Sequence, residues 1–497
     1  MNLADPDFYP GPPFVKNDMA GVTRGPRSRP AAAGRAGVTR AARVPPNAPG
    51  GASADERTGR ICGIIGASPP RAAGAKGALV LGIPVRVRNR ILALLAATLL
   101  AAVPLARGTE TAKAEAGQTA LEAETQEKLD VIFTKYQTLG ACVCVIENGR
   151  VAHTFCYGTL SPDGPAVTAD TLFRVGSISK MVTAMGVMRL AETGAVTLDG
   201  DLSTLLGVTV RNPVYPNTPI TLRQLMSHTA GLRDDTFYTR ALEGDVKPLD
   251  ELFTTEDAKD VFFYRRPGGK MTYSNFGGGL LGVLIETVTG RAVDDYMEDT
   301  FFAPLDITAA YRSSLLPEDV TVSDIYEMPS GTLSDSVRED AGETASPDPM
   351  LDYTLTAGKL TISAPDLAKL LIVLCDNGVY GDTCVLSETS AAAMRTPQNN
   401  IGTVTCESGW GLNMSILTDT LVEGRTLYGH GGKASGMLCA AYFDESDRTG
   451  VVMLTNGCNN LPETNGIGTL SLLTIRLCYS ELIDGRHVTQ NPWLVGE

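Results

Sequence analysis

A serine and a lysine three residues apart offer a nucleophile and a base. Ser177 and Lys180 lie near the start of a stretch in which apolar residues recur at helical spacing, with Gly194 as a suitable C-cap. Residues three apart share one face of a helix, one turn from each other. A serine hydroxyl is a weak nucleophile until a neighbouring base removes its proton. The spacing therefore predicts a nucleophile–base pair for acyl transfer.

The lysine can act as a base only if its neutral form is accessible near neutral pH. Burial among apolar side chains and the positive end of a helix dipole both lower a lysine pKa. An isolated match is still a weak signal, because an N-cap serine followed by a solvated lysine gives the same pattern. An acyl-transfer site also needs an acid for the leaving group, donors for the oxyanion and contacts for the substrate.

Two later stretches supply side chains and backbone of the required kinds. Tyr-x-Asn occurs at residues 215–217, in a proline-rich loop with no helix behind it, and at residues 273–275, in a glycine-flanked loop that leads into an apolar helix. Residues 429–432 (GHGG) fall on an expected strand. Glycines in a strand let another backbone approach closely. We expect the second Tyr-x-Asn and the glycine strand to complete the site.

Taken in order, these elements resemble the motifs Ser-x-x-Lys, Tyr-x-Asn and Lys/His-x-Gly of the serine β-lactamase and penicillin-binding-protein superfamily. The similarity is greatest to the class C-like branch, and it extends to the stretches FRVGSISKMVTA, ITLRQLMSHTAGL, PGGKMTYSNFGGGLLGVLIE and YGHGGKASG. The resemblance implies an α+β fold of the β-lactamase/transpeptidase type. Such a fold has a mostly antiparallel sheet flanked by helices, plus a helical, loop-rich subdomain.

The resemblance assigns catalytic roles to three residues. Ser177 is expected to be the acylated nucleophile and Lys180 its general base. Tyr273 is expected to carry the proton to and from the leaving group, helped by Lys180. No metal ion or other cofactor is expected, and no Cys/His spacing in the chain suits zinc.

The resemblance also assigns substrate-binding roles to Asn275, His430, Gly432 and Lys433. The backbone N–H groups of Ser177 and Lys433 are expected to form the oxyanion hole. Where β-lactamases usually have lysine, this chain has His430, as is seen in esterases, D-amino-acid peptidases and penicillin-binding-protein-like hydrolases. A histidine would hold a substrate carboxylate only when protonated. We therefore expect the substrate specificity to depend on this position.

The elements that position these residues can be read from periodicity and turn signals. Residues 117–138 predict an amphipathic helix, and residues 140–158 predict two strands around an Asn-Gly turn. From residue 409 the pattern becomes that of strands, and a helix over 467–483 closes the chain. Strands at both ends with helices between them favour an antiparallel sheet covered by helices. His228 is expected to be structural, at the end of its helix.

Composition and charge narrow the class of protein. The chain has 497 residues, 43% of them hydrophobic, which is typical of a globular protein with a large core. Its net charge of -14 argues against nucleic-acid binding. We expect a small-molecule or peptidoglycan-type peptide substrate and a monomeric protein.

The N-terminal part of the chain differs from the rest. Residues 1–84 are rich in Arg, Pro and Gly, and we expect them to be disordered and, as one hypothesis, not translated. Residues 85–116 have the three-part layout of a secretory signal peptide. An uncleaved anchor through residues 91–106 is the alternative. Residues 117–497 are expected to form the serine hydrolase domain, on the extracytoplasmic side of the membrane.

Cysteine usage leaves pairing open. Cys142 and Cys144 alternate with valines and are expected to point to one face of a strand as small hydrophobic residues. Cys375 and Cys384 flank a turn and are close enough in sequence to pair, although spacing cannot settle a disulfide.

These observations favour an exported serine hydrolase that forms an acyl-enzyme on Ser177. Its expected substrates are amide or ester bonds of D-Ala-type cell-wall peptides, small esters or β-lactams. The alternative within the same class is a class C-like β-lactamase. A different class, a penicillin-binding sensor or non-catalytic binding module, stays open because some relatives acylate without turnover or have lost catalysis.

Overall fold

The computed structural model describes residues 105–254, 258–339, 348–398, 409–434, 436–459, 463–464 and 467–486. All of them fall within one unit, Arg60–Glu497. The expected tail (1–84) and residues 85–104 of the expected signal segment lie outside the described residues. The first described element is α2 (Leu105–Lys135), which begins before the expected residue 117 and includes residues 105–116 of the expected signal segment.

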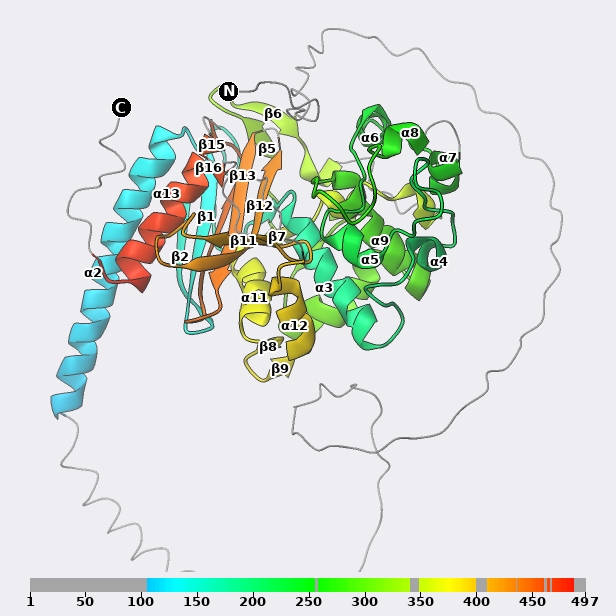
Figure 1. The fold of residues 1–497 in the computed structure, drawn as a ribbon. Helices are drawn as coiled ribbons and strands as arrows, with labels where there is room; N and C mark the ends of the chain where they lie inside the picture. The colour runs from blue at the N-terminus through cyan, green and yellow to red at the C-terminus, as the bar shows by residue number, and fades with distance from the viewer. Residues whose placement is uncertain are drawn as a thin grey trace, which may run out of the picture. The chain divides into compact units, whose positions relative to one another are not determined.

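A seven-stranded antiparallel sheet dominates the fold, in the order β10-β11-β12-β13-β14-β1-β2 (Figure 1). The first and last parts of the described chain therefore share one sheet, because β1 pairs with β14. The expected α+β fold is confirmed. The strands are β1 (Gly140–Glu147), β2 (Arg150–Gly158), β10 (Gly409–Trp410), β11 (Ser415–Thr418), β12 (Thr426–Ala434), β13 (Met437–Asp444) and β14 (Thr449–Thr455).

The predicted Asn-Gly hairpin joins β1 and β2. Asn148 and Gly149 have φ values of 52° and 70°, which is the left-handed pair that a two-residue turn of this hand requires. The strands pair with Ala141 opposite Tyr157, and a bulge interrupts the register between Val145 and Ile146. The hairpin forms the edge of the sheet away from β10.

Alternation along β1 sends side chains into two separate cores. Val143 and Val145 pack in the layer with α2 and α13 (Thr469–Cys478), whereas Cys142 and Cys144 face the layer that contains α11 (Ala364–Cys375). Figure 1 shows α2 and α13 together on one side of the sheet and α11 on the other. The expected placement of the two cysteines on one face is confirmed.

Other predictions in this layer had mixed outcomes. Pro365 lies in the first turn of α11, and the Ser363 hydroxyl caps the helix by accepting from the Asp366 N–H. Cys375 is a free buried thiol, whereas Cys384 is disulfide-bonded, so these two cysteines do not pair with each other. The predicted C-terminal helix (467–483) is formed by α13 from Thr469 to Cys478 and by a π-helical turn that continues it from Tyr479 to Ile483.

A helical region lies beyond α3 (Ile178–Glu192), on the side away from the large sheet (Figure 1). Its buried apolar side chains belong to the same core as those of α3 and α11. The helices of this region are α4 (Leu202–Leu206), α5 (Leu222–Met226), α6 (Thr236–Leu242), α7 (Leu249–Thr254), α8 (Ala258–Val261), α9 (Asn275–Thr289) and α10 (Val293–Met297).

Short strands and one further helix complete the described chain. A three-stranded sheet joins β3, β7 and β4, and β5 pairs with β6, β8 with β9 and β15 with β16. The elements are β3 (Leu172–Arg174), β4 (Ala309–Ala310), β5 (Ile325–Glu327), β6 (Thr332–Asp335), β7 (Thr361–Ser363), β8 (Val379–Tyr380), β9 (Thr383–Cys384), β15 (Glu463–Thr464), β16 (Ile467–Gly468) and α12 (Glu388–Arg395).

Among the described residues, no single helix has the length and apolar character to cross a membrane. Only α9 and the segment Val293–Leu305, taken together as a pair bent by 80°, reach that length and composition.

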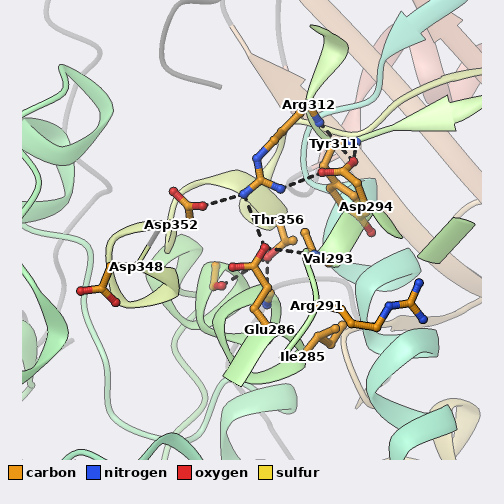
Figure 2. Close-up of polar contacts among 12 residues, drawn as sticks. Ile285, Glu286, Arg291, Val293, Asp294, Tyr311, Arg312, Asp348, Asp352 and Thr356 are labelled. Atoms are coloured by element: carbon orange, nitrogen blue, oxygen red, sulfur yellow. Dashed lines mark hydrogen bonds and ion pairs between the residues drawn. The ribbon is translucent and has the colours of Figure 1, made fainter. Parts of the chain in front are cut away.

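A buried ion network ties α9, α10 and the segment before residue 357 together (Figure 2). The Arg312 guanidinium is within 2.8 Å of Asp294, 2.6 Å of Asp352 and 3.4 Å of Glu286. The Asp294 carboxylate also accepts from the Tyr311 N–H at 2.6 Å. Three carboxylates therefore share one cation in a place with little solvent. Nothing in the local sequence around Asp352 indicates this contact with Arg312.

Replacing Arg312 by Met should destabilise the fold strongly, because three carboxylates would remain close together without a cation. Removing one partner of a buried ion pair typically costs about 3–5 kcal/mol, and we expect a loss of that size in the free energy of unfolding, measured in urea at pH 7. Arg291→Met is the matched control. Arg291 pairs with Asp299 at 2.6 Å at the surface, and exposed pairs contribute about 0–1 kcal/mol.

The pH dependence separates the loss of charge from the loss of packing. Burial raises the pKa values of Glu286 and Asp294. A carboxyl group with a higher pKa in the folded state stabilises that state as the pH falls toward this pKa. The Arg312→Met variant should therefore lose less stability at pH 5 than at pH 7. An equal loss at both pH values would contradict the electrostatic explanation.

Candidate active site

Ser177 lies in a tight turn between β3 and α3. Gly176 has a φ of +56°, and Ser177 is the N-cap residue of α3. The Ser179 hydroxyl donates to the Gly176 carbonyl oxygen at 2.6 Å and accepts from the Leu360 N–H at 3.0 Å. The turn is therefore fixed against the strand that follows residue 359. This arrangement leaves the Ser177 side chain half-exposed at the start of a buried helix.

The Lys180 amine is fully buried and contacts three oxygen atoms. Nζ lies 3.0 Å from Ser177 Oγ, 2.9 Å from Asn275 Oδ1 and 2.5 Å from the Ala357 carbonyl oxygen. Burial lowers the lysine pKa to about 7, although the negative charge of Asp234 acts in the opposite direction. A neutral amine can donate its two hydrogens to Asn275 and Ala357. Its lone pair is then directed to the Ser177 hydroxyl, as a general base requires.

A glycine on α9 makes room for the lysine side chain. A Cβ atom on Gly278 would lie 2.6 Å from Cε of Lys180 and 2.7 Å from its Cδ and Cγ. Non-bonded carbon atoms are most stable about 3.5–4.0 Å apart, so the lysine would have to move. The helix can begin here because the Ser274 hydroxyl accepts from the Gly277 N–H at 3.0 Å. The run of glycines in NFGGG therefore has a steric function at the site.

Tyr273 belongs to a cluster of four rings beside the lysine. The Lys180 amine lies 5.1 Å from the centroid of the Tyr273 ring. The Tyr273 centroid is 4.5 Å from that of His228, 6.0 Å from that of His430 and 6.1 Å from that of Trp410. The structure thus places Tyr273 against Lys180, and its role in proton transfer stays a prediction. Trp410 was not predicted to belong to the site, and His228, expected to be structural, lies in the same cluster.

Both histidines of this cluster are neutral at physiological pH. Burial and the nearby Lys180 charge lower the pKa of His430 to about 4. Burial also lowers the pKa of His228 well below its usual range. His228 Nδ1 accepts from the Ser274 N–H at 3.3 Å, and His430 Nδ1 lies 2.6 Å from its neighbour's carbonyl oxygen on Gly431. The His430 ring therefore carries its proton on Nδ1 and presents no positive charge to a substrate.

Strand β12 runs directly beside the turn that carries Ser177. The pairing of β12 with β11 ends at Gly429. Beyond it, the same edge of β12 lies against the segment of residues 175–176. A Cβ atom on Gly432 would lie 2.0 Å from the Val175 carbonyl oxygen, so a side chain is excluded there. The Lys433 nitrogen is 3.1 Å from the Cβ position of Gly176. The two predicted oxyanion donors, Ser177 N–H and Lys433 N–H, thus lie on adjacent segments.

Asp234 is a residue of the site that the sequence analysis missed. Its carboxylate accepts from the backbone N–H groups of Asn275 and Phe276 at 2.6 and 3.0 Å, from Asn275 Nδ2 at 2.9 Å and from the Ser274 hydroxyl at 2.8 Å. The Asn275 amide is thereby oriented with Oδ1 toward Lys180. Asn275 keeps a second Nδ2 hydrogen, which is available for the predicted contact with a substrate.

The part of the chain that the structure describes contains no group of His, Cys, Asp and Glu side chains arranged to hold a metal ion.

The chain belongs to the beta-lactamase family. Residues 112–473 match the family described as Beta-lactamase. The chain is 32% identical over 349 residues to Penicillin-binding protein 4 of Amycolatopsis lactamdurans, an alignment that covers 67% of this chain and 85% of that protein. The expected membership of the serine β-lactamase and penicillin-binding-protein superfamily is thus confirmed.

Solved structures share the fold at low sequence identity. The octameric penicillin-binding protein homologue from Pyrococcus abyssi superposes with a TM-score of 0.57 at 20% identity, covering 73% of this chain and 78% of that one. D-amino acid amidase from Ochrobactrum anthropi superposes with a TM-score of 0.58 at 20% identity, covering 74% and 100%.

Gly278→Ala should slow acylation of Ser177 because the new methyl group would displace the Lys180 side chain. A misplacement of about 1 Å can cost about 10²-fold in rate, and we expect a loss of about 10- to 100-fold in the rate of labelling by a fluorophosphonate. Gly277→Ala is the control in the same helix turn, since its nearest neighbour lies 3.4 Å from the Cβ position. Equal rates for both variants would contradict this steric role.

Proposed function

We propose that this protein is a serine hydrolase that forms an acyl-enzyme on Ser177 and cleaves amide or ester bonds. The observation that carries the proposal is the 3.0 Å contact between Ser177 Oγ and the buried Lys180 amine. Members of the beta-lactamase family are serine hydrolases, which agrees with this chemistry.

The proposed reaction uses side chains and backbone groups of this chain together with one water molecule. Lys180 takes the Ser177 proton as the oxygen attacks the substrate carbonyl, and the oxyanion binds the N–H groups of Ser177 and Lys433. The proton then passes from Lys180 to the leaving group through the hydroxyl of Tyr273, the phenol of the ring cluster. Water releases the acyl group in the second half of the reaction. A backbone donor at an oxyanion hole typically contributes about 3 kcal/mol to transition-state binding.

The ring cluster favours substrates that do not need a cation at position 430. His430 is buried and neutral, so it would not attract the carboxylate of a β-lactam or a D-alanyl-D-alanine terminus by charge. D-amino acid amidase, whose fold this chain shares, acts on amides by its name. We therefore place D-amino-acid amides and small esters, which need no cation at position 430, before D-Ala-type peptides and β-lactams. Export of the protein is also proposed and rests on the pattern of residues 85–116.

Incubation with a fluorophosphonate should give a covalent adduct on Ser177 in the folded protein, detected by mass spectrometry after digestion. Lys180→Ala should lower the labelling rate by about 10²- to 10⁴-fold, the usual contribution of a general base. Ser177→Ala is the control for the site of modification. The absence of an adduct on folded wild-type protein would overturn the catalytic proposal. A penicillin adduct that forms and disappears rapidly would instead favour β-lactamase activity.

The labelling rate should rise with pH around a midpoint near 7. The Lys180 pKa is about 7, and only the neutral amine can accept the Ser177 proton. Below the midpoint the rate should fall about tenfold per pH unit, since each unit removes that fraction of neutral amine. His430→Gln should leave the midpoint near 7 even if the rate changes, because His430 titrates near pH 4. Loss of the midpoint in that variant would assign it to His430.

A further inference from the structure

The carboxylate of Asp234 is bound entirely by groups at the beginning of α9. Four donors converge on its two oxygens, and two of them are backbone N–H groups in the first turn of the helix. An acidic group at this end of a helix also interacts favourably with the helix dipole. Asp234 therefore anchors the segment that carries Tyr273 and Asn275 to the loop after α5.

The contact continues from Asp234 to the nucleophile through one amide. Asp234 Oδ2 accepts from Asn275 Nδ2 at 2.9 Å, Asn275 Oδ1 accepts from Lys180 Nζ at 2.9 Å, and Lys180 Nζ is 3.0 Å from Ser177 Oγ. Because an amide has distinct donor and acceptor ends, a carboxylate on one side forces the oxygen to the other. The lysine amine is thereby held from the side opposite its lone pair.

We propose that Asp234 is a positioning residue for acylation at Ser177, acting through the Asn275 amide on the Lys180 amine. The inference rests on the proposed acyl-enzyme function and adds a residue that touches neither the nucleophile nor the substrate. The Asp234 carboxylate has two effects on the amine: it fixes the acceptor that orients the amine, and its negative charge favours the protonated form of the amine.

The second effect can be measured because the charge of Asp234 acts on the Lys180 amine in opposition to its burial. The amine lies over the Tyr273 ring, 5.1 Å from its centroid. The two histidines beside it, His228 and His430, are neutral at pH 7 because burial lowers their pKa values. Asp234 favours the charged form of the amine and so raises the Lys180 pKa, in opposition to burial. Removing this charge should lower the Lys180 pKa further, so that the pH midpoint of acylation moves to lower pH.

Asp234→Asn tests both effects in the full chain. An amide has one oxygen and one NH2 group where the carboxylate has two oxygens. The new NH2 group would therefore face another donor, either Asn275 Nδ2 or a backbone N–H. We expect the labelling rate at the optimal pH to fall about 10- to 100-fold, as for other small displacements of reacting groups. The midpoint of the pH profile should also move below that of the wild type. Asp235→Asn is the control: Asp235 caps α6 through Thr236 and pairs with Arg233, and its replacement should change neither quantity.

A double-mutant cycle with Asn275→Ala shows whether the effect passes through the amide. Asp234→Asn should lower the rate much less in the Asn275→Ala background than alone, because the shared contact is already lost. The shift of the midpoint should persist in both backgrounds. The Asn275→Ala variant removes the amide but keeps the two backbone N–H contacts of Asp234. It therefore tests the role of the amide even if the Asp234→Asn variant does not fold.

Three outcomes would overturn the inference while leaving the acyl-enzyme intact. These are a folded Asp234→Asn variant with the wild-type rate and midpoint, rate losses that add fully in the double variant, and the same changes in Asp235→Asn. Failure of the wild-type protein to form an adduct on Ser177 would overturn the proposed function itself, so the two failures are distinguishable.

Discussion

The site depends on the burial of one amine. An ammonium group taken out of water is strongly disfavoured unless it is paired, so a buried lysine tends to lose its proton. In this protein the Lys180 amine is surrounded by oxygen acceptors rather than by a direct ion pair. The neutral form is therefore accessible near pH 7 while the amine stays hydrogen-bonded. Because the buried amine has no water to bind, the oxygen atoms around it must be held at hydrogen-bonding distance by the fold.

Much of the surrounding structure can be understood from that demand. Gly278 removes the side chain that would displace the lysine, and Ala357 must present its carbonyl oxygen to the amine. Asp352, five residues before Ala357, is bound to Arg312 in the buried ion network. The network also joins Glu286 of α9, the helix whose first turn carries Asn275. A set of ion pairs outside the site thus connects two of the segments that contact the lysine.

The sequence predicted what depends on local spacing. Ser177 and Lys180 share one helix turn, and the Asn-Gly turn closes β1 and β2. Family resemblance supplied the order of the three motifs. What could not be predicted depends on contacts between distant segments. Asp234 stands in an acidic pair after a helix, and nothing local indicates that its partners lie in residues 274–276.

His228 and Asp352 illustrate the same limit. A histidine at the end of a helix reads locally as a capping residue, and only the fold brings its ring to 4.5 Å from Tyr273. An aspartate in an acidic stretch reads as solvated, and only the fold places Arg312 beside it. The glycine run of α9 has low helix propensity, and its reason is visible only when the atoms that would meet a Cβ are known.

The charge of the ring cluster links the base to the substrate. A protonated His430 beside a protonated Lys180 would place two cations close together, and each would lower the pKa of the other. The buried ring avoids this by staying neutral and donating its Nδ1 proton to the adjacent carbonyl oxygen. A lysine at this position would bring a second buried cation next to Lys180, whereas a neutral histidine leaves burial and Asp234 to set the protonation of the base. The exposed side chain of Lys433 is then the nearest cation along β12, and a substrate carboxylate would have to reach it from the open side of the strand.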